Sequence, residues 1–378
     1  MIPAPVEFLD RRHRALVRQL ASVPVDALLV THRPNICYLS HFSGSAGWLL
    51  VEPERLTLVS DARYAEALAE LAREVPLLEV EIVWPGGESP EERLVSILAS
   101  RAPLKLGFEP ASLTVNQHQG LMRRCEAAAA AVAWVGVEDA VELLREVKDP
   151  WEIAILRDAG RRLSDVSKCI IPNALAGVPE RQLAARIEWE LRQKGFDRPA
   201  FDTIVAAGPN AALPHHRAGD RPLGEGDLVV VDFGGMYRGY AVDMTRTLTV
   251  GDPTGRQVEC LVAVAEAQKA AFAAARVGVL AEDVDRAARS SLGAAGMGEA
   301  FSHGLGHGLG LEVHERPRLA RHRPGTAGVP LAAGMVFTLE PGVYFPGWGG
   351  VRIEDDVVVT ESGPEWLTEP DDTEVRAT

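Results

Sequence analysis

Two segments of the chain repeat one plan: an apolar strand that ends in an acid, a glycine-containing turn with an aromatic residue, and a returning strand with a second acid. The segments are VDFGGMYRGYAVDMT at 231–245 and LEPGVYFPGWGGVRIEDD at 339–356. A carboxylate that ends an otherwise apolar strand is costly to bury unless a cation compensates its charge. The repeat therefore predicts two hairpins of a duplicated half-domain that close on a common centre. Because hairpins with glycine turns are common, the repeat alone leaves an ordinary sheet open as the alternative.

The first part of the chain alternates short apolar runs with amphipathic ones. Strands are expected at 27–31, 47–51, 56–60, 78–83 and 104–108, and helices at 61–72, 90–99 and 116–127. This alternation predicts an α/β domain over residues 1–147. A long helix should begin the next domain, because Asp149, Pro150 and Glu152 supply an N-cap, a proline at the first helical position and an acid at the third.

Residues 148–378 have a different pattern, with helices followed by glycine-rich, β-prone segments. Helices are expected at 150–168, 179–194, 257–274 and 281–288, and strands at 228–232, 240–250, 335–340 and 351–360. The pattern predicts an α+β domain in which a curved sheet carries helices.

Composition and charge exclude several classes of protein. Hydrophobic residues make up 47% of the 378 residues and the net charge is -14, so the chain should fold and should repel nucleic acid and anionic membranes. The longest apolar run, at 127–137, is too short to cross a bilayer. The four cysteines are far apart, which argues against disulfides and a thiolate zinc site and favours the cytoplasm.

Three of the ten histidines lie close together: His303, His307 and His314. Between 303 and 310 glycine occupies every second position, a period that fits a strand, whereas four glycines would cost a helix about 3 to 4 kcal/mol. In an extended strand the first two histidines lie on one face about 13 Å apart, too far to share a metal. One of them is therefore expected to bind a metal while the other lies further along a cleft, with the glycines allowing another strand to approach.

Two acids of the repeated segments, Asp232 and Glu340, each end an apolar run, and two more, Asp243 and Glu354, lie inside the returning strands. Buried ion pairs with Arg246 and Arg352 are one way to compensate them. Two arginines would leave part of the charge unpaired, whereas two divalent cations would balance four carboxylates. Four oxygen donors with one imidazole suit Mn²⁺, Co²⁺, Zn²⁺ or Fe²⁺. A pair of such ions can hold a hydroxide nucleophile, which predicts a hydrolase.

The ordered segments FDTIVAAGPNAALPHH, VVVDFGGMYRGYAVDMTRT, HGLGHGLGLEVHE, TLEPGVY and GVRIEDDVVV resemble the pita-bread metallopeptidases, specifically the Xaa-Pro branch with prolidase and aminopeptidase P. The N-terminal segments DALLVTHRPNICYLSHFSGS and SDARYAEAL are similar too, so the resemblance covers nearly the whole chain. It implies a creatinase-like α/β N-terminal domain followed by an α+β pita-bread (creatinase/aminopeptidase) catalytic domain.

Carried over by position, the resemblance implies five ligands of a dinuclear site with two divalent ions per subunit, Mn²⁺ being favoured over Co²⁺ or Zn²⁺. These ligands are Asp232, Asp243, His307, Glu340 and Glu354. It further implies that Asp243 and Glu354 bridge the ions, that Glu340 also transfers protons, and that His314 binds the oxyanion.

The resemblance also implies four residues around the substrate. His303 and His215 would line the substrate cleft, Arg352 would support the ligands, and Arg318 would meet the substrate carboxylate. The expected partners are short proline-containing peptides, and a homodimer is expected.

Several alternatives are open at this stage. Creatinase-like enzymes share the fold but work without metal, and methionine aminopeptidase lacks a large N-terminal domain of this kind. A non-catalytic pita-bread binding module should lack some ligands, and none is missing here. Arg318 favours a prolidase, which cleaves Xaa-Pro dipeptides, over an aminopeptidase P, which acts on longer chains.

Overall fold

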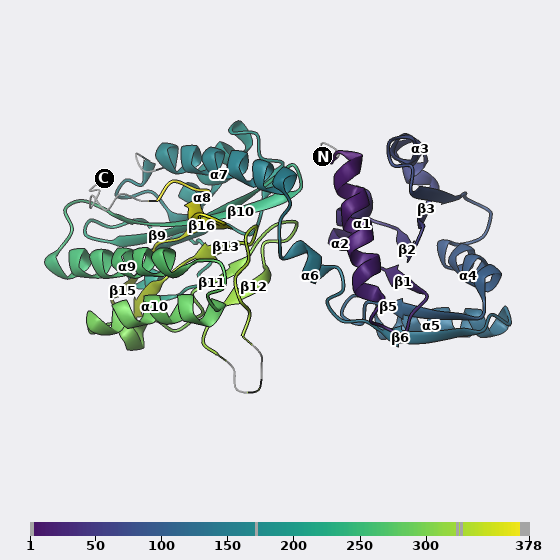
Figure 1. Cartoon of the computed structure of the whole chain (residues 1–378). Helices are drawn as coiled ribbons and strands as arrows, with labels where there is room; N and C mark the ends of the chain where they lie inside the picture. Colours follow the sequence, from purple (N-terminus) through teal and green to yellow (C-terminus); the bar gives the residue numbers. More distant parts are fainter. Residues whose placement is uncertain (1–3, 171–172, 323–324, 326–327, 371–378) are drawn as a thin grey trace. The chain divides into compact units, whose positions relative to one another are not determined.

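The computed structural model describes residues 4–170, 173–322, 325 and 328–370. The chain divides into two units, Met1–Arg145 and Glu146–Thr378, two residues before the expected boundary. Figure 1 shows both units. Among the described residues, no helix combines the length and apolar character that a membrane span requires.

The first unit is built on a six-stranded sheet with the order β4-β3-β2-β1-β5-β6. All its strands run parallel except β2, which pairs antiparallel with both β1 and β3. The strands are β1 (Ala27–Val30), β2 (Trp48–Glu52), β3 (Arg55–Asp61), β4 (Leu78–Val83), β5 (Leu104–Phe108) and β6 (Val132–Gly136). The helices are α1 (Val6–Leu20), α2 (Arg33–Ser40), η1 (Ala62–Tyr64), α3 (Ala65–Glu74), α4 (Pro90–Arg101), α5 (Val115–Ala127) and α6 (Glu142–Arg145).

The second unit combines a four-stranded sheet, β10-β9-β7 with β8 also on β9, a five-stranded sheet, β12-β11-β13-β16-β17, and a β14–β15 hairpin. Its helices are α7 (Pro150–Ile170), α8 (Glu180–Gln193), η3 (Gly208–Ala212), α9 (Gly255–Ala274), α10 (Ala281–Ala294) and η4 (Gly298–Ala300). Its first strands are β7 (Arg198–Pro199), β8 (Ile204–Ala207), β9 (Leu228–Tyr237), β10 (Tyr240–Thr249), β11 (Gly306–Gly308) and β12 (Glu315–Leu319). The others are β13 (Val336–Leu339), β14 (Gly342–Phe345), β15 (Gly349–Arg352), β16 (Asp355–Thr360) and β17 (Gly363–Trp366).

Helix α7 begins where the sequence predicted. Asp149 Oδ1 accepts hydrogen bonds from the amides of Trp151 and Glu152, each at 3.0 Å, and Glu152 Oε2 accepts from the Asp149 amide at 3.0 Å. This reciprocal arrangement satisfies amides that the first turn of a helix leaves without intrahelical acceptors.

The strands of the second unit lie between two hydrophobic cores. Val336 packs into the core that contains α7 and α8, whereas its neighbour Phe337 packs into the core with α9 and α10. Successive side chains of a strand point to opposite faces, so one strand serves both cores. Figure 1 shows α7 on one side of these strands and α9 and α10 on the other.

The expected strand at 351–360 is interrupted. β15 pairs with β14, and β16 pairs with β13, with Ile353 and Glu354 between them. Instead of continuing either ladder, the Glu354 amide donates to the Thr245 carbonyl of β10 at 3.1 Å. The break thus brings Glu354 to the β9–β10 hairpin.

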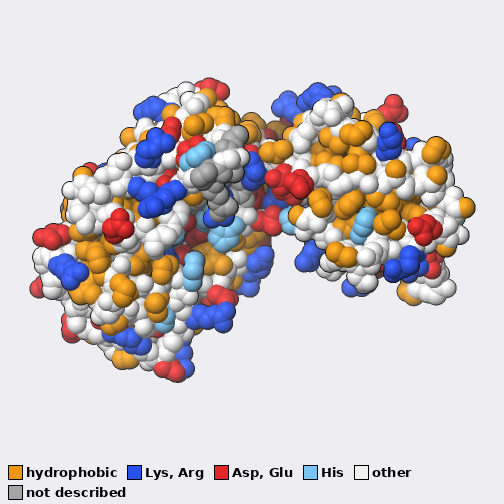
Figure 2. Space-filling model, turned by 90° about the horizontal axis from the view of Figure 1, so that it is seen from below, with side chains coloured by type: hydrophobic (Ala, Val, Ile, Leu, Met, Phe, Trp, Pro, Cys, Tyr) orange, Lys and Arg blue, Asp and Glu red, His pale blue; other side chains and the backbone are white. Residues whose placement is uncertain are grey.

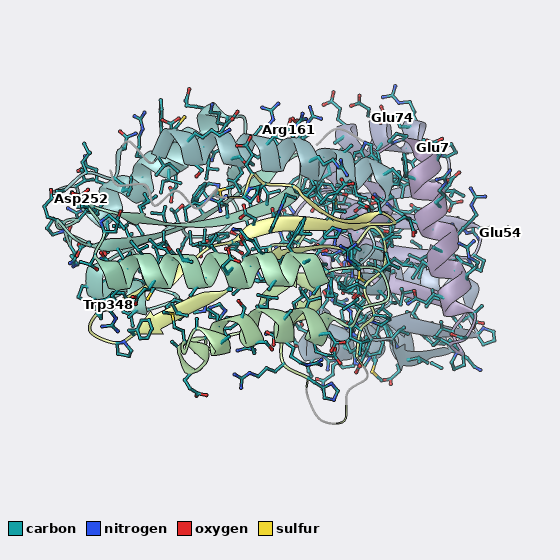
Figure 3. All side chains as sticks on the ribbon, turned by 60° about the vertical axis from the view of Figure 1, so that its left-hand side comes forward. Glu7, Glu54, Glu74, Arg161, Asp252 and Trp348 are labelled. Carbon is teal, nitrogen blue, oxygen red and sulfur yellow. The ribbon has the colours of Figure 1, made fainter. Side chains whose placement is uncertain are left out.

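Many charged residues of the chain face solvent. In Figure 3, Glu7 on α1, Glu74 on α3 and Arg161 on α7 project outward, as does Asp252 in the β10–α9 turn. The acids discussed below are instead enclosed within the second unit.

Candidate metal centre

The β9–β10 hairpin presents two predicted ligands on one face. Asp232 lies opposite Thr245, and Asp243 precedes Thr245 by two residues. Opposed residues of an antiparallel pair share a face, and side chains alternate with a period of two, so all three point to the same side. Asp243 is buried, and its Oδ1 accepts from the Met244 amide at 2.8 Å.

The second pair of acids flanks the other predicted hairpin, β14–β15. Glu340 directly follows β13, where its amide donates to the Leu305 carbonyl at 2.8 Å. Glu354 lies in the break after β15, and its Oε2 accepts from Thr245 Oγ1 at 2.6 Å. Thr245 therefore connects the two hairpins at the centre of the site.

His307 lies in β11, which is shorter than expected. The predicted strand, rather than a helix, is confirmed at Gly306–Gly308, but a strand spanning all of 303–310 is wrong, and pairing with β12 shifts register after His307. The close approach of neighbouring strands is confirmed. A Cβ at Gly306 would lie 2.0 Å from the Thr338 carbonyl oxygen, and a Cβ at Gly308 would lie 2.0 Å from the Arg316 carbonyl oxygen. Both glycines are thus required on steric grounds.

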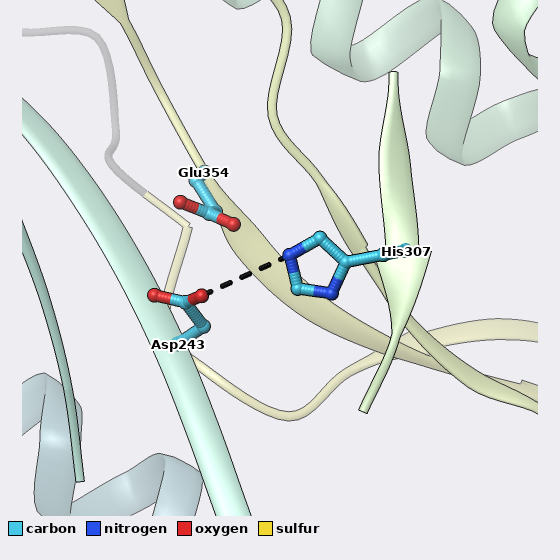
Figure 4. Close-up of side chains that lie close together, drawn as sticks. All are labelled: Asp243, His307 and Glu354. Atoms are coloured by element: carbon cyan, nitrogen blue, oxygen red, sulfur yellow. Dashed lines mark ion pairs between the residues drawn. The ribbon is translucent and has the colours of Figure 1, made fainter. Parts of the chain in front are cut away.

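Three of the five predicted ligands gather around one point (Figure 4). One ligand atom each from Asp243, His307 and Glu354 lies within 4.8 Å of the other two. His307 Nε2 is 4.0 Å from Asp243 Oδ2 and 3.8 Å from Glu340 Oε1. The negative charge of Asp232 contributes to the raised pKa of Asp243.

Burial and mutual repulsion make the carboxyl groups of this site harder to ionise. Burial, reinforced by Glu354 and Asp232, raises the pKa of Asp243 well above its ordinary value. Burial likewise raises the pKa of Glu340, and it raises the pKa of Glu354 to about 8. Burial lowers the pKa of His307 to about 4, so its imidazole is neutral at pH 7 and free to act as a nitrogen ligand.

Arginine pairing compensates only part of this charge. Arg352 Nη2 donates to Asp232 Oδ2 at 2.6 Å, whereas Arg246 Nη2 donates at 2.7 Å to Asp355, an acid outside the predicted set. The ion-pair alternative therefore applies to one of the four acids. Within the described part of the chain, the buried Asp232 Oδ1 has no hydrogen-bond partner. This orphaned oxygen, the crowded carboxylates and the neutral imidazole fit divalent cations.

His303 lies outside this group and belongs to a hydrogen-bonded chain. Its Nδ1 is 2.8 Å from the Gly304 carbonyl, which can only accept, so we place the ring proton on Nδ1. Nε2 then accepts from Tyr344 Oη at 2.9 Å, and Arg352 Nη1 donates to the same oxygen at 3.0 Å. Burial lowers the pKa of His303 to about 4, consistent with a neutral ring.

The remaining predicted residues, His215, His314 and Arg318, are exposed. The exposed His314 packs edge-on against His307 at 4.3 Å between ring centroids, and the exposed Arg318 lies opposite His307 in the β11–β12 register. Partial burial and Arg318 both lower the pKa of His314. His215 is exposed after η3. Burial is the main cause of the lowered pKa values of His303 and His314, and the charge of His215 contributes to both. Several histidine side chains are visible together on this unit in Figure 2.

Two side chains of the site, Tyr344 and Thr245, were not predicted from the sequence, although a sequence pattern could have pointed to each. Tyr344, which lies in β14, is one of the three aromatic residues of the second repeated segment, whose plan includes an aromatic near the turn. Thr245 follows Asp243 by two residues in a strand, so the period of two places it on the ligand face.

Comparison with known proteins shows the family to which the chain belongs. Residues 154–361 match the model for metallopeptidase family M24, and residues 12–147 match the creatinase/prolidase N-terminal domain. The Xaa-Pro dipeptidase of Pyrococcus horikoshii is 34% identical over 96% of this chain and 98% of its own length.

Solved structures are similar over both units. An Xaa-Pro dipeptidase from Bacillus anthracis has a TM-score of 0.87 and 33% identity, covering 96% of this chain and 98% of its own. An X-Pro aminopeptidase from Thermotoga maritima has a TM-score of 0.82 and 33% identity, covering 93% and 97%. The chain is therefore an enzyme of metallopeptidase family M24, with a creatinase/prolidase N-terminal domain and a pita-bread catalytic domain.

Proposed function

We propose that the chain is an Xaa-Pro dipeptidase that hydrolyses the bond before proline with the help of two divalent cations. The observation that carries the proposal is a neutral imidazole among carboxylates of which, in the described part of the chain, only Asp232 pairs with an arginine, in a chain of the M24 family. The residues that would hold the cations are Asp232, Asp243, His307, Glu340 and Glu354.

The donor set favours Mn²⁺, since it offers carboxylate oxygens and a single nitrogen, with Co²⁺ or Zn²⁺ as alternatives. When bound, such ions polarise the scissile carbonyl and lower the pKa of an attacking water. Arg352 keeps Asp232 oriented for this task by its 2.6 Å hydrogen bond, and Thr245 does the same for Glu354.

Glu340 is the acid best placed to move protons. Its side chain is 19% exposed, compared with 7% for Asp243, so water and substrate can reach it. It would take a proton from the attacking water and deliver it to the proline nitrogen as that nitrogen leaves. His314, exposed beside His307, would donate its ring N–H to the developing oxyanion.

Substrate selection follows from the chemistry of proline. The scissile nitrogen carries no hydrogen and the ring fixes φ, so an extended-backbone binding mode cannot position the bond. Arg318 is exposed opposite His307 and forms no ion pair among the described residues, so it is available for a free C-terminal carboxylate. This favours a dipeptide, whose carboxylate belongs to the proline itself. His215 and His303 would line the same cleft.

The proposal also includes the oligomeric state and the cellular location of the protein. We expect a homodimer, which light scattering of the purified protein would detect as twice the 40.7 kDa chain mass. The four cysteines are free, which favours a reducing compartment such as the cytoplasm. Short proline-containing peptides are the proposed partners, and the net charge of -14 argues against nucleic acid and anionic membranes.

The deciding experiment compares Ala-Pro with Ala-Pro-Ala after chelation and reloading with Mn²⁺, Co²⁺ or Zn²⁺. The proposal expects two ions per chain by elemental analysis and rapid cleavage of Ala-Pro, with the tripeptide at least about 100-fold slower because its carboxylate is displaced. Comparable tripeptide turnover would replace the dipeptidase by an aminopeptidase. A protein that holds two ions and cleaves neither peptide would contradict both.

A further inference from the structure

A second buried acid, outside the metal centre, holds one loop of the site. Glu180 is the first residue of α8, and its side chain is completely buried. Oε1 accepts from the Ala207 amide and Asn210 Nδ2, each at 2.9 Å. Oε2 accepts from His216 Nε2 at 2.8 Å and the Gly219 amide at 3.1 Å. Four donors therefore converge on one carboxylate.

These donors decide what Glu180 can do. Burial alone would raise its pKa, but the hydrogen bonds outweigh burial and lower the pKa below its ordinary value. Glu180 is therefore ionised at neutral pH, and both of its oxygens are occupied. A carboxylate in this state is unsuited to proton transfer, but it is a strong anchor for the groups that donate to it.

All four donors belong to one segment, residues 207–219, which also carries His215. His216, on one side of His215, is fixed by Glu180. Pro214, on the other side, offers its carbonyl to Arg352 Nη1 at 3.4 Å, and Arg352 also binds Asp232. His215 thus lies between an anchor at Glu180 and an anchor at the metal centre.

We propose that Glu180 is a positioning residue for substrate binding: by fixing segment 207–219 it holds His215 in the cleft beside His303 and His314. This inference rests on the proposed function, because it assigns His215 to the binding of the Xaa-Pro substrate. Glu180 contacts no reacting atom. It acts through the loop.

Glu180→Gln tests the proposal. The glutamine side chain has the same size, but its NH₂ group replaces one carboxylate oxygen and faces groups that are themselves hydrogen-bond donors. In the Mn²⁺-loaded enzyme, KM for Ala-Pro should rise about 10-fold while kcat changes by less than about 3-fold, the pattern expected for lost substrate binding. Glu190→Gln is the matched control. Glu190 is also buried on α8 but pairs at 2.6 Å with Arg186 of the same helix, so its KM should stay at the wild-type value.

A double-mutant cycle with His215→Ala separates positioning from general damage. If Glu180 acts through His215, Glu180→Gln should add less than about 2-fold to KM once His215 is alanine. Effects that multiply in full would overturn the proposal. So would a lowered thermal midpoint with KM unchanged, because that result is expected of a merely structural acid.

Hydrogen exchange gives a readout that needs no substrate. Exchange in peptides covering 207–219 should accelerate in Glu180→Gln but not in Glu190→Gln, because the Ala207 and Gly219 amides bind different oxygens of Glu180 and one of them loses its acceptor. Unchanged exchange would contradict the inference even if wild type cleaves Ala-Pro. Wild type that does not cleave Ala-Pro would instead contradict the proposed function.

His216 variants keep the test decisive if Glu180→Gln does not fold. His216→Ala removes one donor and leaves three on Glu180, and it should raise KM in the same direction. His216→Gln, which keeps an N–H donor of similar reach, should restore KM to within about 3-fold of wild type. Alanine and glutamine variants with equal KM would overturn the proposal.

Discussion

The catalytic unit buries carboxylates in two contrasting ways. Glu180 is surrounded by four hydrogen-bond donors, and its pKa falls. The acids around Asp243 face one another, the pKa of Asp243 rises, and Asp232 keeps one oxygen without a partner among the described residues. A buried carboxylate that is satisfied by protein donors holds structure. One with few such donors takes up a proton or binds an external cation, and this difference separates the anchor from the metal centre.

The largest test of this contrast removes the cation or one of its ligands. Chelation, or Asp243→Asn in the presence of Mn²⁺, should lower kcat/KM for Ala-Pro at least about 1000-fold, because several kcal/mol of charge stabilisation are lost. Elemental analysis should find fewer than two ions on the variant. The Glu190→Gln variant is the control, with two ions and wild-type activity. Full activity in the chelated protein would contradict the assignment of a metal centre.

The contributions of the metal-site acids and of Glu180 to stability should also change in opposite directions with pH. The pKa of Glu354 rises from 4.5 to about 8 without metal, so between these values the folded state keeps a proton that the unfolded state has released. Stability from that proton is present below about 4.5 and is lost as pH rises towards 8. The lowered pKa of Glu180 contributes stability that is present above 4.5 and lost as pH falls below that value.

Thermal unfolding in EDTA checks this sign. The midpoint of the chelated protein should fall between pH 6.5 and pH 8, above the range in which the lowered pKa values of His303 and His307 act with the opposite sign. Glu354→Gln should reduce this slope because the titrating group is gone. Bound Mn²⁺ should flatten the same profile, since the cation replaces the proton. A midpoint that rises with pH in EDTA would show that these carboxylates are already compensated by the protein.

The sequence predicted one of these environments and missed the other. In two similar hairpins, one acid of the metal centre ends an apolar run and a second lies in the returning strand, a local pattern that is visible in the chain. The donors of Glu180 lie 27 to 39 residues away, with no periodicity linking them to α8. The expected strand at 303–310 was wrong for a similar reason. Arg289 of α10 donates to the carbonyls of Phe301 and His303, which is a tertiary contact that glycine spacing cannot reveal.

The anchor itself should matter for stability at neutral pH. Glu180→Gln leaves at least one buried donor facing the new amide, which should cost about 2 kcal/mol in the free energy of unfolding and lower the thermal midpoint by roughly 4 to 8 °C. Because the benefit of Glu180 depends on its charge, the difference from wild type should shrink as pH falls below 4.5. Urea titrations at pH 7 and pH 4 measure both. A cost that is equal at the two values would show that shape, rather than charge, holds the loop.

The smallest effect on activity is expected from a substitution of Tyr344. Its hydroxyl accepts from Arg352, which orients Asp232, and donates to His303 in the cleft. Tyr344→Phe removes this one bridging oxygen while the ring remains, so kcat/KM for Ala-Pro should fall about 10-fold and the metal content should stay at two ions. Loss of metal in this variant would mean that Tyr344 supports the metal centre through Arg352. Retention of metal with a raised KM would mean that Tyr344 acts through His303, in substrate binding.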